Sequence, residues 1–552
     1  MIRPLDSFSI HSRSALFRSL SSTSFDLLVI GGGITGASIL RDAAKRGLSV
    51  ALVEARDFAI GTSSRSSKLV HGGLRYLKSG SFNVTWESCH ERDLHVRLNR
   101  RLVTPEPFLI PLYSDRGTPR HMAKAGMVGY ELMSGLKNYR FHRYLTRAEV
   151  LLRAPGIDSA GLVGGYEYFD AVVSDNRFTI ETIKDGVRHG GWALNYTPVL
   201  KLIKAEKNCA GAVVRDELTG AEYTVKAAAI VNATGVFADT IRRMDDPQAA
   251  DRIALSKGTH LVFESRDIPS NTTIAFSSPI DNRLVFLIRY EGCFLFGTTD
   301  DWEHNEDMAH PGPALKDCRY LIETLSRFMP GAAINLSRVA FSYAGYRPLV
   351  MSTGSERSPD KVSRGDVTEI SPSGLISIMG GKLTTARRMA EKIVDIVVKK
   401  SGKKRRYRNC TTDRDPIGGS NDEVADGIAF WTRHCPELKD YIADLFKRYG
   451  SDGTSIVEEA VNIVQGRHPD PEAEPIRAEV QYVCRNEMVC TLEDLIERRA
   501  GYLVWSREKR LERLMYGAHI IKQELGLDED TRKRQYEEYR ATLEHFHTCP
   551  GN

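Results

Sequence analysis

The sequence predicts an α/β protein in which a Rossmann-like dinucleotide-binding domain is interleaved with an antiparallel-sheet domain and followed by an all-helical C-terminal domain. Three observations predict it: a glycine-rich strand–turn–helix pattern near residue 25, a second glycine-to-helix pattern near residue 380, and a helix-forming composition beyond residue 411. We expect the first two patterns to bound one domain over residues 25–398. Its substrate-binding part is expected at roughly 100–160 and 258–345.

The composition is ordinary for a globular protein of this size. The 552 residues are 41% hydrophobic and 27% charged, with a formal net charge of +5, which argues against global disorder and against a nucleic-acid partner. The nine cysteines are dispersed without a CxxC pair, so neither a disulfide framework nor a metal site is expected. No apolar run reaches about 18 residues, so any membrane contact would be peripheral.

Three segments outside this domain differ from it in composition. Residues 1–24 are rich in Ser and carry three Arg against one Asp, which is typical of a transit peptide or of a disordered lead-in; we expect an N-terminal tail. Residues 399–411 are expected to be a linker, and 399–408 hold seven basic residues and no acid. Such a run lies in a solvated loop or meets an anionic membrane surface. Residues 412–552 are expected to be helical.

The first glycine pattern has every part of a dinucleotide-binding unit. Phe25–Ile30 is a near-continuous apolar run, as in a strand that is buried on both faces. It is followed by a GxGxxG turn made of Gly31, Gly33, Ile34, Thr35 and Gly36. A helical pattern to Arg46 and a second strand at Ser49–Val53 lead to Glu54, where a carboxylate can bind ribose hydroxyls. The turn and helix N-terminus predict a pyrophosphate site.

Three later segments identify the dinucleotide. Residues 61–77 are dense in hydroxyl side chains and glycines, as suits a phosphate–ribityl chain. A buried strand at Ala227–Ala233 ends in an Ala-Thr-Gly turn after a short-strand insertion, an order that recurs in two-segment FAD folds. The strand Gly374–Met379 meets a second glycine turn and a helix that runs to about Val398. That helix N-terminus is well suited to the N1/O2 edge of a flavin, where reduction creates negative charge.

The segments IGGGITGAS, GTSSRSSKLVHGGLRYL, VNATGVFAD, LFGTTD, YAGYRPL and GGKLTTARRMAEK follow one another in this order. Together they resemble the FAD-dependent sn-glycerol-3-phosphate dehydrogenases of the aerobic, quinone-linked type, over residues 25–398. The helical remainder is similar to the C-terminal domain of that family. The resemblance implies FAD as cofactor and an FAD-binding domain of the glutathione-reductase/D-amino-acid-oxidase type. The expected cofactor-binding residues are Gly31, Gly33, Ile34, Thr35, Gly36, Glu54, Thr62, Ser63, Ser64, Ser66, Ser67, Leu69, His71, Gly72, Gly73, Val199, Ala233, Thr234, Gly235, Gly381, Lys382, Leu383 and Thr384.

The resemblance also implies a substrate, glycerol 3-phosphate, that is oxidised to dihydroxyacetone phosphate by hydride transfer from C2 to FAD. A phosphate dianion needs converging cations, and Arg offers it a planar fork of donors. The expected substrate-binding residues are Tyr76, Thr298, Arg347, Arg364 and Lys382. The C2 hydroxyl must lose a proton, for which His is the usual base. His71 and His260 are both candidates, and Arg347 can steady the developing alkoxide.

The resemblance implies a membrane quinone as electron acceptor. We also expect a homodimer. The expected location is the cytoplasmic face of a bacterial inner membrane, because Asp528–Asp530 lacks the rest of the calcium-binding loop that mitochondrial relatives carry. The mitochondrial inner membrane is the alternative. Three other functions stay open: a glycerol-3-phosphate oxidase that makes hydrogen peroxide, a flavoenzyme that oxidises amines or hydroxy acids, and a non-catalytic nucleotide-binding regulator.

Overall fold

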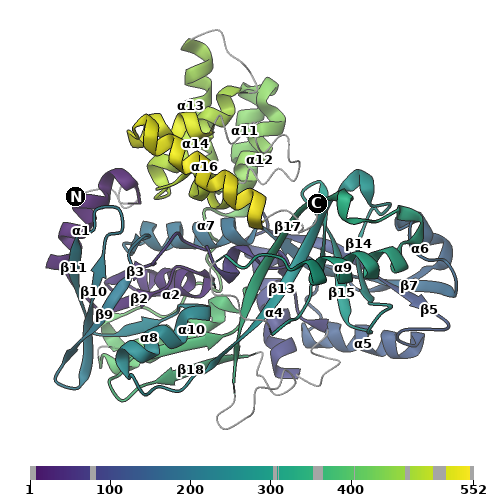
Figure 1. Cartoon of the computed structure of the whole chain (residues 1–552), viewed down its shortest axis with the longest axis horizontal. Coiled ribbons are helices and arrows are strands. Elements are labelled where there is room, and N and C mark those ends of the chain that lie inside the picture. The colour runs from purple at the N-terminus through teal and green to yellow at the C-terminus, as the bar shows by residue number, and fades with distance from the viewer. Residues whose placement is uncertain are drawn as a thin grey trace.

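The computed structural model describes residues 8–74, 82–302, 308, 310–351, 365–402, 404–466, 473–500 and 517–546. It confirms the predicted fold class: an α/β body built on mixed sheets carries a separate group of helices at the C-terminal end (Figure 1). Among the described residues, no helix is both long enough and apolar enough to span a membrane.

The dinucleotide-binding sheet is assembled from distant parts of the chain. Its described strands lie in the order β18 (Asp366–Ile370), β19 (Ile376–Gly380), β12 (Ile230–Asn232), β2 (Leu27–Ile30), β3 (Val50–Val53) and β8 (Trp192–Leu194). All neighbours are parallel except β18, which is antiparallel to β19. The parallel strands are short and apolar because both of their faces are buried.

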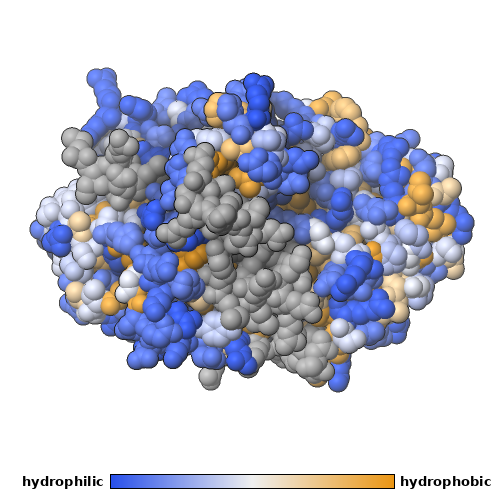
Figure 2. Space-filling view, turned by 90° about the horizontal axis from the view of Figure 1, so that it is seen from above, coloured by the Kyte–Doolittle hydropathy of each residue, from blue (hydrophilic) through white to orange (hydrophobic). Residues whose placement is uncertain are grey.

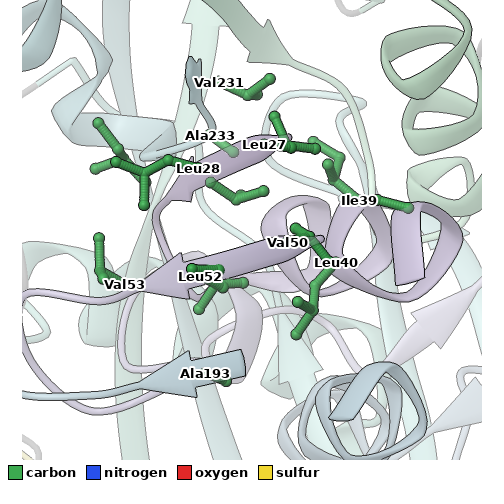
Figure 3. Packing of buried hydrophobic residues seen from close by; sticks show 14 of the residues in the cluster. Leu27, Leu28, Ile39, Leu40, Val50, Leu52, Val53, Ala193, Val231 and Ala233 are labelled. Atoms are coloured by element: carbon green, nitrogen blue, oxygen red, sulfur yellow. The ribbon is translucent and has the colours of Figure 1, made fainter. Parts of the chain in front are cut away.

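Helices cover this sheet and close its core. The helix α2 (Ile34–Lys45) packs beside α7 (Asp175–Arg188) and α10 (Ala386–Lys400). Side chains of β2 and β3, such as Leu28 and Leu52, pack with Ile39 of α2 in one hydrophobic cluster (Figure 3). A smaller sheet lies beside it, with β1 (Ser24–Phe25), β11 (Glu222–Ala227), β10 (Asn208–Arg215) and β9 (Val199–Ala205). The predicted strand Ala227–Ala233 is wrong in extent, because the chain changes sheets between β11 and β12.

A large, mainly antiparallel sheet forms the second part of the body. Its described strands are ordered β17 (Val339–Val350), β13 (Ile253–Glu264), β16 (Cys293–Gly297), β15 (Leu284–Tyr290), β14 (Thr273–Ser277), β5 (Val103–Tyr113), β7 (Leu162–Val173) and β4 (Leu69–Val70), with β6 (Arg143–Thr146) on β7. Its flanking helices are α4 (Phe82–Leu98), α5 (Arg120–Met133), α6 (Arg147–Arg153) and α9 (Leu315–Phe328), while α8 (Ala238–Asp245) lies at the dinucleotide-binding sheet.

The C-terminal helices have a hydrophobic cluster of their own. They are α11 (Asn421–His434), α12 (Lys439–Tyr449), α13 (Gly453–Gly466), α14 (Ala473–Asn486), a π-helical turn at Asp494–Arg499, and α16 (Glu529–Phe546). The predicted helix start at Thr491 is confirmed, because the Asp494 amide donates to Thr491 Oγ1 (3.2 Å) and the Thr491 amide to Asp494 Oδ2 (2.9 Å).

The N-terminal segment differs from the prediction. Residues after the first seven form a short turn at Ile10–Ser12 and the helix α1 (Arg13–Ser22), so a disordered tail over 1–24 is wrong for this part. Phe8, Phe17 and Leu20 are buried in the same cluster as the dinucleotide-binding sheet. The Arg13 guanidinium is also buried and pairs with Asp216 at 2.8 Å. Burying three apolar side chains stabilises the folded segment by several kcal/mol, about 1.5–3 for each.

Candidate active site

The glycine turn after β2 makes a close contact between strand, turn and helix. A Cβ atom on Gly36 would lie 1.9 Å from the carbonyl oxygen of Gly31, and one on Gly31 would lie 2.6 Å from the carbonyl oxygen of Ala233. Gly31 also has a φ of +110°, which side chains disfavour. Gly33, the N-cap residue of α2, has no side chain to cap the helix, and the next amide, that of Ile34, donates to Ser63 Oγ at 2.9 Å. This helix N-terminus faces the side of the turn where an anion is expected.

A cavity of about 360 Å³ opens over this turn. The predicted cofactor residues that line it are Gly31, Gly33, Ile34, Thr35, Glu54, Thr62, Ser63, Ser66, Val199, Ala233, Thr234, Gly235, Gly381, Lys382 and Leu383. Each of the predicted glycine and hydroxyl segments therefore contributes to one cavity, and so does the N-terminal approach to α10.

Other predicted cofactor residues do not line this cavity. They are Gly36, Ser64, Ser67, Leu69, His71, Gly72, Gly73 and Thr384. Ser64 still contacts the cavity wall, because its Oγ donates to the carbonyl of the lining residue Ala59. Thr197 and Pro198, which line the cavity just after β8, were not predicted. They follow the carboxyl end of a parallel strand, where ligands of such sheets commonly bind, so the sequence could have indicated them. The cavity-lining α8 residues Thr240, Ile241 and Met244 were not predicted either.

Glu54 lies at the edge of the cavity as predicted for a ribose-binding acid. Its carboxylate accepts the amides of Gly32 (2.6 Å) and Arg56 (3.0 Å), which fix its orientation. Burial raises its pKa, while these two amides oppose the rise. The N-termini of α2 and α10, the glycine turn and this carboxylate fit FAD, which needs partners for pyrophosphate, ribose and flavin along one cavity.

Arg347 lies on β17 directly before Pro348, which lines the cavity. Its guanidinium donates to Thr298 Oγ1 at 2.8 Å and to Ser256 Oγ at 3.2 Å, and forms an ion pair with Asp300 at 3.5 Å. The Arg347 side chain is 33% exposed, so an anion can reach it. The structure therefore brings Arg347 and Thr298 together beside the cavity.

Lys382 connects the cavity to α4. It lines the cavity, and its ammonium donates to Ser88 Oγ at 3.3 Å. Tyr76 and Arg364 lie outside the described residues, so their predicted roles rest on the sequence.

His260 is held deep in β13. Its ring is 2% exposed and stacks on Tyr343, with ring centres 4.8 Å apart. Nε2 lies 2.9 Å from Ser67 Oγ, and Nδ1 has no hydrogen-bond partner within the described part of the chain. Burial lowers the pKa of His260 to about 3, and the charges of Arg347 and Lys68 add to this effect. The imidazole is therefore neutral at neutral pH, and this environment weakens its basicity.

His71 is placed differently. It is half-buried, and its backbone amide donates to Thr384 Oγ1 at 3.3 Å. This bond joins the His-Gly-Gly segment to the turn before α10, two segments that are far apart in the sequence. Both histidines thus lie on the elements that form the site, and the choice between them as the base stays a prediction.

Comparisons with known proteins point to one family. The family model described as FAD dependent oxidoreductase matches residues 26–395, and the one described as the C-terminal domain of alpha-glycerophosphate oxidase matches residues 410–532. Aerobic glycerol-3-phosphate dehydrogenases of Staphylococcus haemolyticus and Bacillus subtilis are 35% and 36% identical to the chain, over 90% of each protein.

Solved structures give the same answer. The glycerol-3-phosphate dehydrogenase from Bacillus halodurans, in complex with FAD, superimposes with a TM-score of 0.80 at 29% identity, over 97% of this chain and 98% of that one. An L-alpha-glycerophosphate oxidase from Mycoplasma pneumoniae with FAD bound shares the fold at a TM-score of 0.53 and 16% identity, over 68% of this chain and 95% of that one. With FAD as its cofactor, the chain belongs to the FAD-dependent glycerol-3-phosphate dehydrogenase family.

Proposed function

We propose that the chain oxidises sn-glycerol 3-phosphate to dihydroxyacetone phosphate. The observation that carries the proposal is the position of Arg347, a partly exposed cation beside the FAD cavity with Thr298 at hydrogen-bond distance. A phosphate dianion suits such a site, since charge-assisted bonds to guanidinium are among the strongest in proteins. The names of the relatives support the same substrate.

The residues of the chain divide the chemistry among them. Bound FAD supplies the hydride acceptor for C2. Arg347 and Lys382 hold the substrate anion and exclude substrates without one. His260, or alternatively His71, takes the hydroxyl proton. Substrate phosphate beside Arg347 would offset the repulsion between Arg347 and protonated His260, and so would raise the proton affinity of the base in the complex.

Anaerobic titration tests cofactor, substrate and reaction together. Glycerol 3-phosphate is expected to bleach the flavin absorbance of the purified holoenzyme, whereas glycerol and amino acids leave it unchanged. Bleaching by an amino acid or a hydroxy acid instead would favour the competing flavoenzyme class. A flavin that no substrate bleaches, together with salt-sensitive DNA binding, would favour the non-catalytic regulator.

We further propose a membrane quinone as the electron acceptor, supported by the relatives that are named dehydrogenases. Mixing the reduced enzyme with a soluble quinone analogue, and separately with oxygen, distinguishes the two acceptors. Fast reoxidation by the quinone is expected. Stoichiometric hydrogen peroxide without quinone reduction would favour the oxidase.

A surface near α4 and α5 supports a peripheral membrane location. We call it the α5 surface, and it comprises Phe82, Trp86, Met122, Val128, Leu132, Leu136 and Phe141, all exposed. Three of them, Met122, Val128 and Leu132, belong to α5. At about 100° per residue they lie within about 120° of one another around the helix axis, so they share one face. Trp86 contacts the His90 ring, which lies beside Gly135, so the two helices contribute to one area.

Charge favours an anionic lipid partner for the α5 surface. The exposed bases Arg120, Lys124, Lys137 and Arg140 lie on or next to it, and each base near such a membrane contributes about 1 kcal/mol. α5 lies on the opposite side of the molecule from α11–α16 (Figure 1). The face seen from the side of those helices is mainly hydrophilic, with scattered hydrophobic residues (Figure 2). The basic run at 399–408 stays a second candidate for the contact.

Replacing Met122 and Leu132 together with Glu is expected to weaken binding to phosphatidylglycerol vesicles at least about tenfold, because two anchors become charged. Sedimentation with vesicles measures it, and flavin bleaching serves as the folding check. The matched control is Leu152→Glu, a 77% exposed leucine on α6 outside this surface. Equal losses in both variants would contradict the assignment, and loss confined to Lys399→Gln/Lys400→Gln would favour the basic run.

A further inference from the structure

Asp57 lies in the loop that follows β3, between Glu54 and Ala59, which both line the FAD cavity. Its side chain is fully buried. The carboxylate accepts from Arg498 Nε at 2.5 Å, from Arg499 Nη1 and Nη2 at 2.8 and 2.7 Å, and from Asn195 Nδ2 at 2.9 Å. An acid in the FAD-binding loop thus has its cationic partners in the C-terminal helical domain.

Both arginines also have partners within their own domain. Arg498 pairs with Asp494 at 3.0 Å and with Glu493 at 2.9 Å. Arg499 Nε donates to the Glu487 carbonyl at 2.9 Å. Since these partners belong to the C-terminal domain, which has a separate hydrophobic cluster, the guanidinium pair is a preorganised receptor for one carboxylate.

The segment that follows β8 also lines the cavity and also contacts the C-terminal domain. The Tyr196 hydroxyl donates to Asp494 Oδ1 at 2.7 Å, and Asn195 Nδ2 also donates to the Met488 carbonyl at 2.9 Å. Thr197, which follows Tyr196 in the sequence, lines the cavity, and its amide donates to the Glu54 carbonyl at 2.7 Å. The ends of β3 and β8 are therefore connected to each other and to the C-terminal domain.

The charges of Asp57 and its two arginines determine what happens if the C-terminal domain separates from the FAD-binding domain. Burial alone would raise the pKa of Asp57, but Arg499 and Arg498 hold it below its usual value, so Asp57 is ionised in the docked protein. A buried carboxylate that loses its cations is strongly destabilising. Without the C-terminal domain, the loop around Asp57 is expected to turn this side chain toward water and to leave its place on the cavity wall.

We propose that docking of the C-terminal domain through Arg498 and Arg499 holds the Asp57 loop in its FAD-binding conformation, so that FAD binding and domain docking stabilise one another. Asp57, Arg498 and Arg499 are positioning residues. The proposal rests on FAD as cofactor and is independent of the substrate and of the electron acceptor. Its test therefore needs no turnover.

The first test compares Asp57→Asn with Glu487→Gln. Glu487 also joins the two domains, since its carboxylate pairs with Arg177 and Lys184 of α7, each at 2.7 Å. Glu487→Gln alters these contacts but keeps the backbone carbonyl that Arg499 binds. FAD affinity of the deflavinated proteins is measured by fluorescence quenching, together with thermal unfolding of each apoprotein. Asp57→Asn is expected to weaken FAD binding at least about tenfold more than Glu487→Gln does. Equal FAD affinities in the two variants would overturn the proposal, whatever their unfolding temperatures.

A conservative variant covers the case in which Asp57→Asn does not fold. Arg499→Lys keeps the charge and loses the two-pronged contact. It is expected to raise the dissociation constant for FAD about threefold or more, and an unchanged constant would count against the proposal.

The reciprocal effect can be measured in the unaltered protein. Because coupling between two binding events acts equally in both directions, FAD should protect the C-terminal contact. Amide hydrogen exchange at residues 488–500 is expected to be slower in the holoprotein than in the apoprotein, with no such difference in α13. Identical exchange at 488–500 in both forms would overturn the proposal.

Discussion

Replacing Arg347 with Met is expected to lower kcat/KM for glycerol 3-phosphate by about a hundredfold to a thousandfold. Removing one partner of a hydrogen-bonded charge pair in a binding site costs about 2–5 kcal/mol, and about 1.4 kcal/mol corresponds to a factor of ten. Arg347 is a partly exposed cation beside the cavity, bonded to Thr298 and directly before the cavity-lining Pro348. Steady-state kinetics with a soluble quinone analogue measures the loss.

Arg347→Lys is the matched control. Lys keeps the charge but cannot make the forked contact, so an intermediate loss is expected. Arg347 itself does not line the FAD cavity, and both variants should therefore keep their flavin. A dissociation constant for glycerol 3-phosphate that stays unchanged in Arg347→Met would contradict a phosphate-binding role.

His260→Gln is expected to slow anaerobic reduction of the flavin by at least about a hundredfold, as for loss of a general base. The neutral imidazole at the Ser67 hydroxyl is the better-defined of the two candidates, because its ring position is fixed by stacking on Tyr343. Stopped-flow absorbance at saturating substrate isolates this step from reoxidation.

His71→Gln serves as the comparison for the base. A large loss in His71→Gln with a small one in His260→Gln would reverse the assignment. If neither variant is slow, the histidine base is wrong. Flavin content must be measured in both, since the His71 backbone supports the wall of the cavity through Thr384.

Local patterns predicted most of the flavin cavity because its contacts are made by backbone and by neighbours in sequence. The close approach of Gly36 to the carbonyl oxygen of Gly31 leaves no room for a Cβ atom, so this contact requires glycine and can be recognised in the sequence. Glu54 follows its strand directly. In contrast, Thr197 and the α8 residues are generic in type, and only the sheet order brings them to the cavity.

The long-range ion pairs could not be predicted from the sequence. Asp57 and Arg499 are separated by 442 positions, and neither stands in a distinctive motif. The N-terminal segment was misjudged for a different reason. Its Ser-rich composition masked Leu16, Phe17 and Leu20, whose spacing is that of an amphipathic helix with one buried face.

The strand order of the dinucleotide-binding sheet limits how early during translation this sheet can form. The neighbours β2 and β12 are separated by about two hundred residues, and β19 is added only at Ile376–Gly380. At roughly 5–20 residues per second, a ribosome needs on the order of half a minute between the first and the last of these strands. Flavin capture must therefore wait for most of the polypeptide, and the early apolar strands need protection from aggregation meanwhile. Arg498 and Arg499 leave the ribosome later still, so the cofactor loop acquires its final support near the end of translation.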